Sequence, residues 1–160
     1  ISILAYNLET VLAEKLETVL SRNIANTRPR DYYDVHILYA LRGADCDKAT
    51  LRRALERTTQ KRGSGMILTD YPEIMKEIRG SDTLRKLWEK YSREYEYAKD
   101  ISFDDTCNTI QTIMDAIKVE TKGGLLYGLA GSAGRDYGDW AFYRACLLGD
   151  WTILRAYHSL

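Results

Sequence analysis

Apolar residues recur along the first 120 positions of the chain at intervals of three and four, which is the spacing of amphipathic α-helices. The clearest run follows Asn7, a residue that suits the N-cap position, and it predicts a helix that ends near Arg22. The apolar stripe of this helix consists of Leu8, Val11, Leu12, Leu16, Val19 and Leu20.

Proline, glycine and capping residues divide the next stretch into two more helices. Pro29 suits the first turn of a helix, and Gly43 follows the last apolar position of that run. Asp47 then caps the basic segment "KATLRRALERTTQKR", which Gly63 ends. The pattern therefore predicts a second helix from Pro29 to Gly43 and a third between Asp47 and Gly63.

Three further helices are predicted before residue 120. A short one follows Pro72 with the sequence "EIMKEI", and Ser81 caps another that continues to Lys99. Ser102 and Asp105 have capping-box spacing at the start of the last one. No segment alternates in the way that a strand does, so the predicted fold is all-α, a bundle of about six helices.

Residues 121–160 differ in composition from the rest of the chain. The segment "KGGLLYGLAGSAGRDYG" contains six glycines, and the residues after it are rich in aromatic side chains. We expect a helical domain over residues 1–120, and over residues 121–160 a glycine-rich linker with a tail that could be helical. Exposed aromatic residues in such a tail would offer a surface for self-association.

The balance of charge restricts the partners of the protein. The 23 basic and 23 acidic residues cancel, so binding to nucleic acid or to an anionic membrane would need a local patch. The three cysteines, Cys46, Cys107 and Cys146, form no Cys-x-x-Cys pair, and we interpret them as core or surface thiols in a reducing compartment. The sequence has no apolar run of membrane-span length and no signal-peptide pattern. These features predict a cytoplasmic protein with no membrane partner.

One lysine interrupts the apolar stripe of the first predicted helix. Lys15 lies four residues from both Val11 and Val19, so it falls on the face that is expected to pack inward. A half-buried ammonium group is costly unless something pairs with it. The solvated face of the same helix is predicted to carry Glu9, Glu14 and Glu17.

Two aspartates occupy similar positions in the second predicted helix. Asp31 shares a face with Val35 and Leu38, and Asp34 lies three residues after Asp31. Because helices joined by a short loop pack together, we expect Lys15 to converge with both carboxylates. Two interpretations remain open: a buried ion pair that sets the register of the helices, or a site for phosphate or metal-nucleotide chemistry.

Several short motifs are similar to those of one family. They are "LAEKLE" (Leu12 to Glu17), "RPRDYYD" (Arg28 to Asp34), "LERTTQKRG", "LWEKY" and "YAKDISFDD", in this order and spacing. On these motifs, residues 1–118 resemble the C-terminal helical half of the AbiEii/AbiGii nucleotidyltransferase toxins of type IV toxin-antitoxin systems, which act in abortive infection of bacteria.

The resemblance implies roles for individual residues. Lys15 matches the lysine of the family's third motif and is expected to contact nucleotide phosphate, with Arg28 and Arg30 beside it. Asp31 matches the essential aspartate of the last motif, and Asp34 is expected to support it, so both are assigned as catalytic. Arg30 stands where the family usually has lysine, which keeps the charge but not the compact ammonium.

The resemblance also implies a motif that this region lacks. The family's first motif is a Gly-Ser followed by Asp-x-Asp on a strand, which holds the catalytic magnesium. "GSAGRDYGD" (Gly131 to Asp139) imitates it, but its Asp136 and Asp139 are three apart and would not share a strand face, so we interpret it as a turn. The resemblance implies magnesium and a nucleoside triphosphate for the full-length protein. From the sequence, we expect this chain alone to hold neither and to be inactive. The chain begins with Ile1 and not with methionine, as a fragment or processed product does.

Other features carry weaker predictions. In the basic third helix, Arg52, Arg53 and Arg57 are candidates for contacts with RNA phosphates, although a solvated helix face is the simpler interpretation. His36 and His158 have no ligand-spaced companions, so no metal site is predicted on them.

Two functions follow from these observations. The first is the substrate-facing half of a toxin that transfers a nucleotide to an RNA, such as tRNA, or to a protein acceptor, with an antitoxin that acts indirectly. The alternative is a non-catalytic helical module for antitoxin binding or self-assembly.

Overall fold

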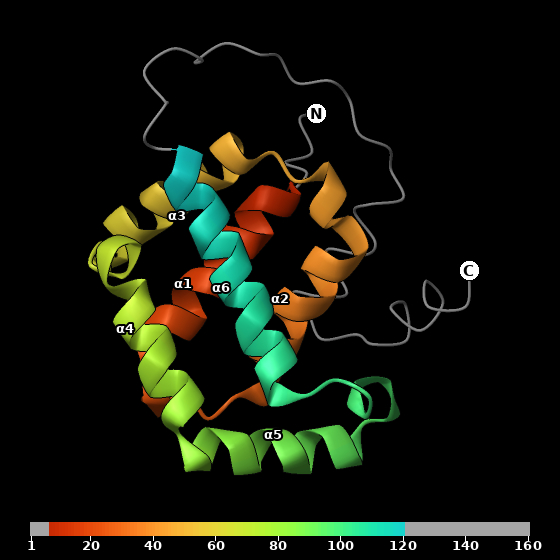
Figure 1. Cartoon of the computed structure of the whole chain (residues 1–160). Helices are drawn as coiled ribbons and strands as arrows, with labels where there is room; N and C mark the ends of the chain where they lie inside the picture. Colours follow the sequence, from red (N-terminus) through yellow and green to blue (C-terminus); the bar gives the residue numbers. More distant parts are fainter. Residues whose placement is uncertain (1–6, 121–160) are drawn as a thin grey trace.

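The computed structural model describes residues 7–120, which form six α-helices and three short 3-10 helices (Figure 1). The α-helices are α1 (Leu8–Arg22), α2 (Pro29–Arg42), α3 (Lys48–Arg62), α4 (Ile67–Gly80), α5 (Asp82–Glu94) and α6 (Phe103–Glu120). The 3-10 helices are η1 (Asn23–Ala25), η2 (Gly43–Asp45) and η3 (Glu96–Ala98). The described part of the chain contains no strand, so the all-α prediction is confirmed. The predictions for residues 121–160, including Cys146, His158 and "GSAGRDYGD", lie outside the described residues.

Helix α1 is the centre of the bundle. It packs against α2, α3 and α4, while α6 crosses in front of it and contacts the same three helices (Figure 1). Helix α5 lies across one end of the bundle, against α2 and α6 (Figure 1). Because three helices surround α1, most of its side chains are buried, including Ala13 at the edge of the predicted apolar stripe and Glu17 outside it.

The predicted caps are present in the structure. The side chains of Asn7 and Asp47 each accept a hydrogen bond from the backbone N–H three residues later, at 2.8 and 3.2 Å. Ser102 and Asp105 exchange two such bonds, at 2.9 and 3.0 Å, which confirms the capping box of α6. Gly63 ends α3 in the left-handed conformation, with a φ of 70°. These short-range signals position the helix ends that surround the site.

Helix α4 begins earlier than predicted. It starts at Ile67, so Pro72 lies inside the helix and does not precede it. The proline has no N–H to donate to the carbonyl of Leu68, so α4 lacks one backbone hydrogen bond in its second turn. Ile67 and Tyr71 are buried in the core, and Tyr71 also donates a hydrogen bond to Asp115 of α6 at 2.6 Å. Burial of this first turn outweighs the turn-forming tendency of the proline.

Helix α5 ends earlier than predicted. It stops at Glu94, and Tyr95 has extended backbone before η3 begins. Trp88 donates its indole N–H to the carbonyl of Ile101 at 2.9 Å, and this bond holds the returning chain against α5. Tyr95 is exposed and does not continue a buried stripe along the helix.

None of the described helices has the length and apolar character needed to cross a membrane.

Candidate functional site

The three charged residues singled out in the sequence converge between α1 and α2. The Lys15 ammonium donates a hydrogen bond to Asp34 Oδ2 at 2.7 Å, and it lies 3.8 Å from Asp31 Oδ1. The Lys15 side chain is 15% exposed, while those of Asp31 and Asp34 are 2% and 0% exposed. The predicted convergence of one cation with two buried carboxylates is confirmed.

The short connection from α1 to α2 supports this arrangement. Asn26, in the loop between the two helices, is buried and places its amide 3.5 Å from Asp31 Oδ2. Its side-chain oxygen accepts the backbone N–H of Arg28 at 3.1 Å. The Arg28 guanidinium in turn lies 3.7 Å from Asp31 Oδ2. Asn26 was not predicted as part of the site, because an asparagine in a loop has the same sequence signature as any turn residue.

Burial governs the electrostatics of Asp34. Loss of solvation raises the pKa of this carboxyl to about 6, and the neighbouring Lys15 ammonium opposes the rise. Its second oxygen, Oδ1, is buried and has no hydrogen-bond partner among the described residues. Asp34 is thus ionised for most molecules at neutral pH, with Lys15 as its closest cation.

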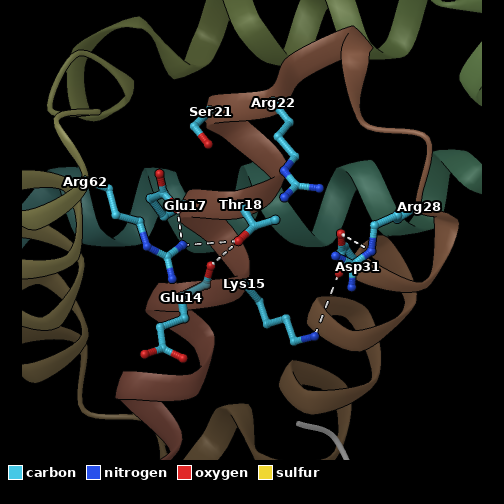
Figure 2. A pocket seen from close by; sticks show the side chains of 9 residues that line it. All are labelled: Glu14, Lys15, Glu17, Thr18, Ser21, Arg22, Arg28, Asp31 and Arg62. Atoms are coloured by element: carbon cyan, nitrogen blue, oxygen red, sulfur yellow. Dashed lines mark hydrogen bonds and ion pairs between the residues drawn. The ribbon is translucent and has the colours of Figure 1, made fainter. Parts of the chain in front are cut away.

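A surface pocket of about 490 Å³ opens beside Lys15 (Figure 2). One face of α1 forms much of its wall, α2 contributes the next part, and the end of α3 closes the opposite side (Figure 2). The lining residues are Glu14, Lys15, Glu17, Thr18, Ser21, Arg22, Arg28, Asp31 and Arg62. The pocket is therefore polar and rich in guanidinium groups.

The pocket divides the residues predicted to form the site. Lys15, Arg28 and Asp31 line it, whereas Asp34 and Arg30 do not. Asp34 lies fully buried beside the Lys15 ammonium. Arg30 is partly buried. Burial raises the pKa of both Asp34 and Tyr97, and the charge of Arg30 opposes the rise in each, so Arg30 lies near Asp34 and toward η3.

Two glutamates predicted to be solvated are buried instead. Glu9 has no exposed surface and accepts the backbone N–H of Asp47 at 2.9 Å. Glu17 is 3% exposed, accepts the hydroxyl of Ser64 at 2.8 Å and forms an ion pair with Arg62. The solvated-face prediction for both was wrong, because α3 packs along the polar side of α1. Glu14 is partly exposed at the pocket.

The predicted RNA contacts lie elsewhere on α3 and do not line the pocket. Arg52 forms an ion pair with Glu56 at 2.7 Å, and Arg53 donates to Thr50 Oγ1 at 3.2 Å. Arg53 and Arg57 are exposed. Only Arg62, at the end of the same basic segment, reaches the pocket, and sequence reasoning did not separate it from the others.

The described residues do not fit a magnesium site. They contain no group of three or more His, Cys, Asp or Glu side chains that could hold a metal ion. An ammonium group already lies between Asp31 and Asp34, and a cation there excludes a second one. Asp45 and Asp47 have Asp-x-Asp spacing, but Asp45 pairs with Arg42 and Asp47 caps α3.

Histidine and cysteine offer no alternative centre in residues 7–120. His36 Nδ1 lies 2.7 Å from the Thr109 hydroxyl. Cys107 is buried in the core and Cys46 is partly buried, consistent with their interpretation as structural thiols. The chemistry of the described part of the chain therefore centres on the lysine, the two aspartates and the arginines of the pocket.

Comparison with known proteins agrees with the motifs. Searches of curated proteins and of solved structures gave no match. A family model described as the nucleotidyl transferase AbiEii toxin of type IV toxin-antitoxin systems matches residues 1–112, which include α1 to α5 and the first half of α6. The chain therefore belongs to the AbiEii family of nucleotidyl transferase toxins.

Proposed function

We propose that this chain forms the nucleotide-binding helical part of a toxin that transfers a nucleotide from a nucleoside triphosphate to an acceptor. The acceptor is an RNA, such as tRNA, or a protein. One observation carries the proposal: two buried carboxylates hold the Lys15 ammonium at the wall of a pocket large enough for part of a nucleotide. A lysine that only fixed the register of two helices would not need an open pocket beside it.

The two aspartates have different roles in this proposal. Asp31 lines the pocket, so it is the carboxylate that can contact substrate, and we assign it the catalytic role. Asp34 is fully buried and does not line the pocket, so we assign it as a positioning residue for Lys15. Lys15 and Arg28 then face the phosphates of the nucleotide. No step is assigned to magnesium on these residues, because they do not fit a magnesium site.

The proposed acceptor and partner rest on different grounds. A type IV toxin-antitoxin family pairs each toxin with an antitoxin, so an antitoxin is the expected partner of the intact system. The exposed arginines of α3, Arg53 and Arg57, are the proposed contacts for an RNA acceptor.

Nucleotide binding by the purified chain tests the proposal. We expect titration calorimetry to detect binding of at least one of ATP, GTP, CTP and UTP, and Lys15→Ala to weaken it tenfold or more. Lys86→Ala, exposed on α5 outside the pocket, is the matched control and should bind like the unaltered chain. If no triphosphate binds, or if both variants bind equally well, the lysine is a structural ion-pair partner and the interaction-module function is favoured.

A further inference from the structure

The three converging residues do not explain anion binding by themselves. One lysine and two aspartates carry a net charge of −1 when all are ionised, and such a group repels a polyphosphate. The affinity of the pocket for phosphate must therefore come from its other cations. These are Arg22, Arg28 and Arg62.

Arg22 differs from the other two arginines in its partners. Arg28 lies 3.7 Å from Asp31, and Arg62 forms its ion pair with the buried Glu17. Arg22 makes no ion pair with any residue that the structure describes, and it is exposed. Its guanidinium is consequently the pocket cation whose charge is least compensated by protein carboxylates.

The geometry of α1 directs Arg22 into the same pocket as Lys15. The two residues are seven apart, two helical turns, and Thr18 and Ser21 lie on the face between them. Figure 2 shows the Arg22 guanidinium pointing into the hollow, between Thr18 and Arg28. The arrangement therefore places an ammonium group and three guanidinium groups around one space, with two hydroxyls along its wall.

We propose that Arg22 is a phosphate-binding residue of the pocket and that the site recognises its nucleotide chiefly through the polyphosphate. This inference rests on the proposed function and adds a residue that lies outside all of the sequence motifs quoted above. A guanidinium binds two phosphate oxygens at once, which suits a flexible polyphosphate better than a single ammonium does. The last carbonyls of α1 carry partial negative charge, so an anion at this end of the helix requires a cationic side chain such as Arg22.

A simpler role for Arg22 makes a different prediction. As the basic residue in the last turn of α1, it would only complement the helix dipole and affect stability. Arg93 is likewise the basic residue in the last turn of α5, is exposed and lies outside the pocket, which makes Arg93→Gln the matched control. A dipole role predicts similar, small effects of Arg22→Gln and Arg93→Gln on the melting temperature and no effect on ligand binding.

The experiment compares ligands that differ only in phosphate number. Affinities of the unaltered chain, Arg22→Gln, Arg22→Lys and Arg93→Gln are measured for a nucleoside, its monophosphate and its triphosphate. We expect Arg22→Gln to weaken triphosphate binding at least tenfold, to weaken monophosphate binding less and to leave nucleoside binding unchanged. Arg22→Lys should recover part of the loss. Arg93→Gln should leave all three affinities unchanged.

The possible failures of the two proposals are distinguishable. If the unaltered chain binds triphosphate through Lys15 and Arg22→Gln binds it equally well, the inference is overturned and the proposed function stands. If no nucleotide binds, the proposed function is overturned. Inorganic tripolyphosphate then serves as the probe: binding that Arg22→Gln weakens supports the phosphate site, and binding that it does not weaken overturns it as well.

Discussion

The Lys15 ammonium lies 2.7 Å from a carboxylate oxygen of Asp34, a residue with no solvent exposure. The contact joins α1 to α2 at the wall of the pocket, with Asp31 on the pocket side. Because a buried carboxylate fixes the ammonium from behind, Lys15 has little freedom to leave the position at which a phosphate would meet it. If the proposed function holds, stability and ligand binding both depend on this pair, but in ways that experiments can separate.

Replacement of Lys15 by methionine should destabilise the protein by about 3 kcal/mol at pH 8, because it leaves buried carboxylates without their cation. Urea denaturation followed by circular dichroism measures this change. In the double variant Lys15→Met/Asp34→Asn, much of the lost stability should return, since the uncompensated charge is also removed. Nucleotide binding should stay impaired in both variants. Recovery of binding together with stability would show that Lys15 has only a structural role.

The raised pKa of Asp34 predicts a pH dependence of stability. Burial raises this pKa from 3.8 to about 6, so the native state binds the proton more tightly than the unfolded state does. The stabilisation is fully present below pH 3.8 and is lost as the pH rises through 6. Between pH 4 and 6.5, the free energy of unfolding of the unaltered chain should therefore fall relative to that of Asp34→Asn.

Asp104 provides the control for this pH series. The Arg85 guanidinium, which hydrogen-bonds to Asp104, holds the pKa of this exposed carboxyl below its ordinary value. The sign is reversed, so the unaltered chain should gain a little stability relative to Asp104→Asn as the pH rises from the acid range. If the differences in unfolding free energy between the unaltered chain and each of the two variants changed with pH in the same direction, the assignment of the effect to Asp34 would be contradicted.

Charge reversal of Arg52, Arg53 and Arg57 tests the RNA contacts predicted on α3. If these residues touch phosphates, the triple glutamate variant should weaken tRNA binding and reduce the slope of log K against log salt by roughly 0.7–0.9 per lost contact. Filter binding across a salt series measures both quantities. Because Arg52 already pairs with Glu56, Arg53 and Arg57 should account for most of the effect. Reversal of Lys86 and Lys90, exposed on α5, is the control.

The purified 160-residue chain should not transfer nucleotides with any nucleoside triphosphate and magnesium. The reason is chemical: residues 7–120 offer no carboxylate group suited to the metal that neutralises charge in phosphoryl transfer. Incorporation of labelled nucleotide into total tRNA is the measurement. If label is incorporated, the same assay would first be repeated with the variants Asp136→Asn and Asp139→Asn, because both aspartates lie in the segment that imitates the missing motif.

Periodicity and capping predicted most of the fold, because these signals are local to each helix. The starts of α1, α3, α5 and α6 and the glycine end of α3 follow directly from Asn7, Asp47, Ser81, Ser102 and Gly63. The start of α4 was missed because the burial of Ile67 depends on the neighbouring helices and not on the nearby Pro72. Packing against the neighbouring helices, and not the local signal of Pro72, therefore sets the start of α4.

The site was predictable in part, for a similar reason. Lys15 and Asp31 interrupt their own apolar stripes, so each helix separately indicated an inward-facing charge. Glu17 gave no such signal, because whether its face is solvated depends on where α3 packs. Arg62 and Arg22 look like ordinary surface charges in the sequence, and their common pocket exists only in three dimensions.

The central position of α1 has a consequence for hydrogen exchange. Exposing the backbone amide of Lys15 to solvent requires separating α1 from α2, α3 and α4 together, so this amide should exchange only through global unfolding. The backbone of α1 along the pocket should thus be ordered before any ligand arrives, so that binding does not have to order it. A bound nucleotide should then slow exchange by a similar factor at every amide protected by global unfolding, even those far from the pocket.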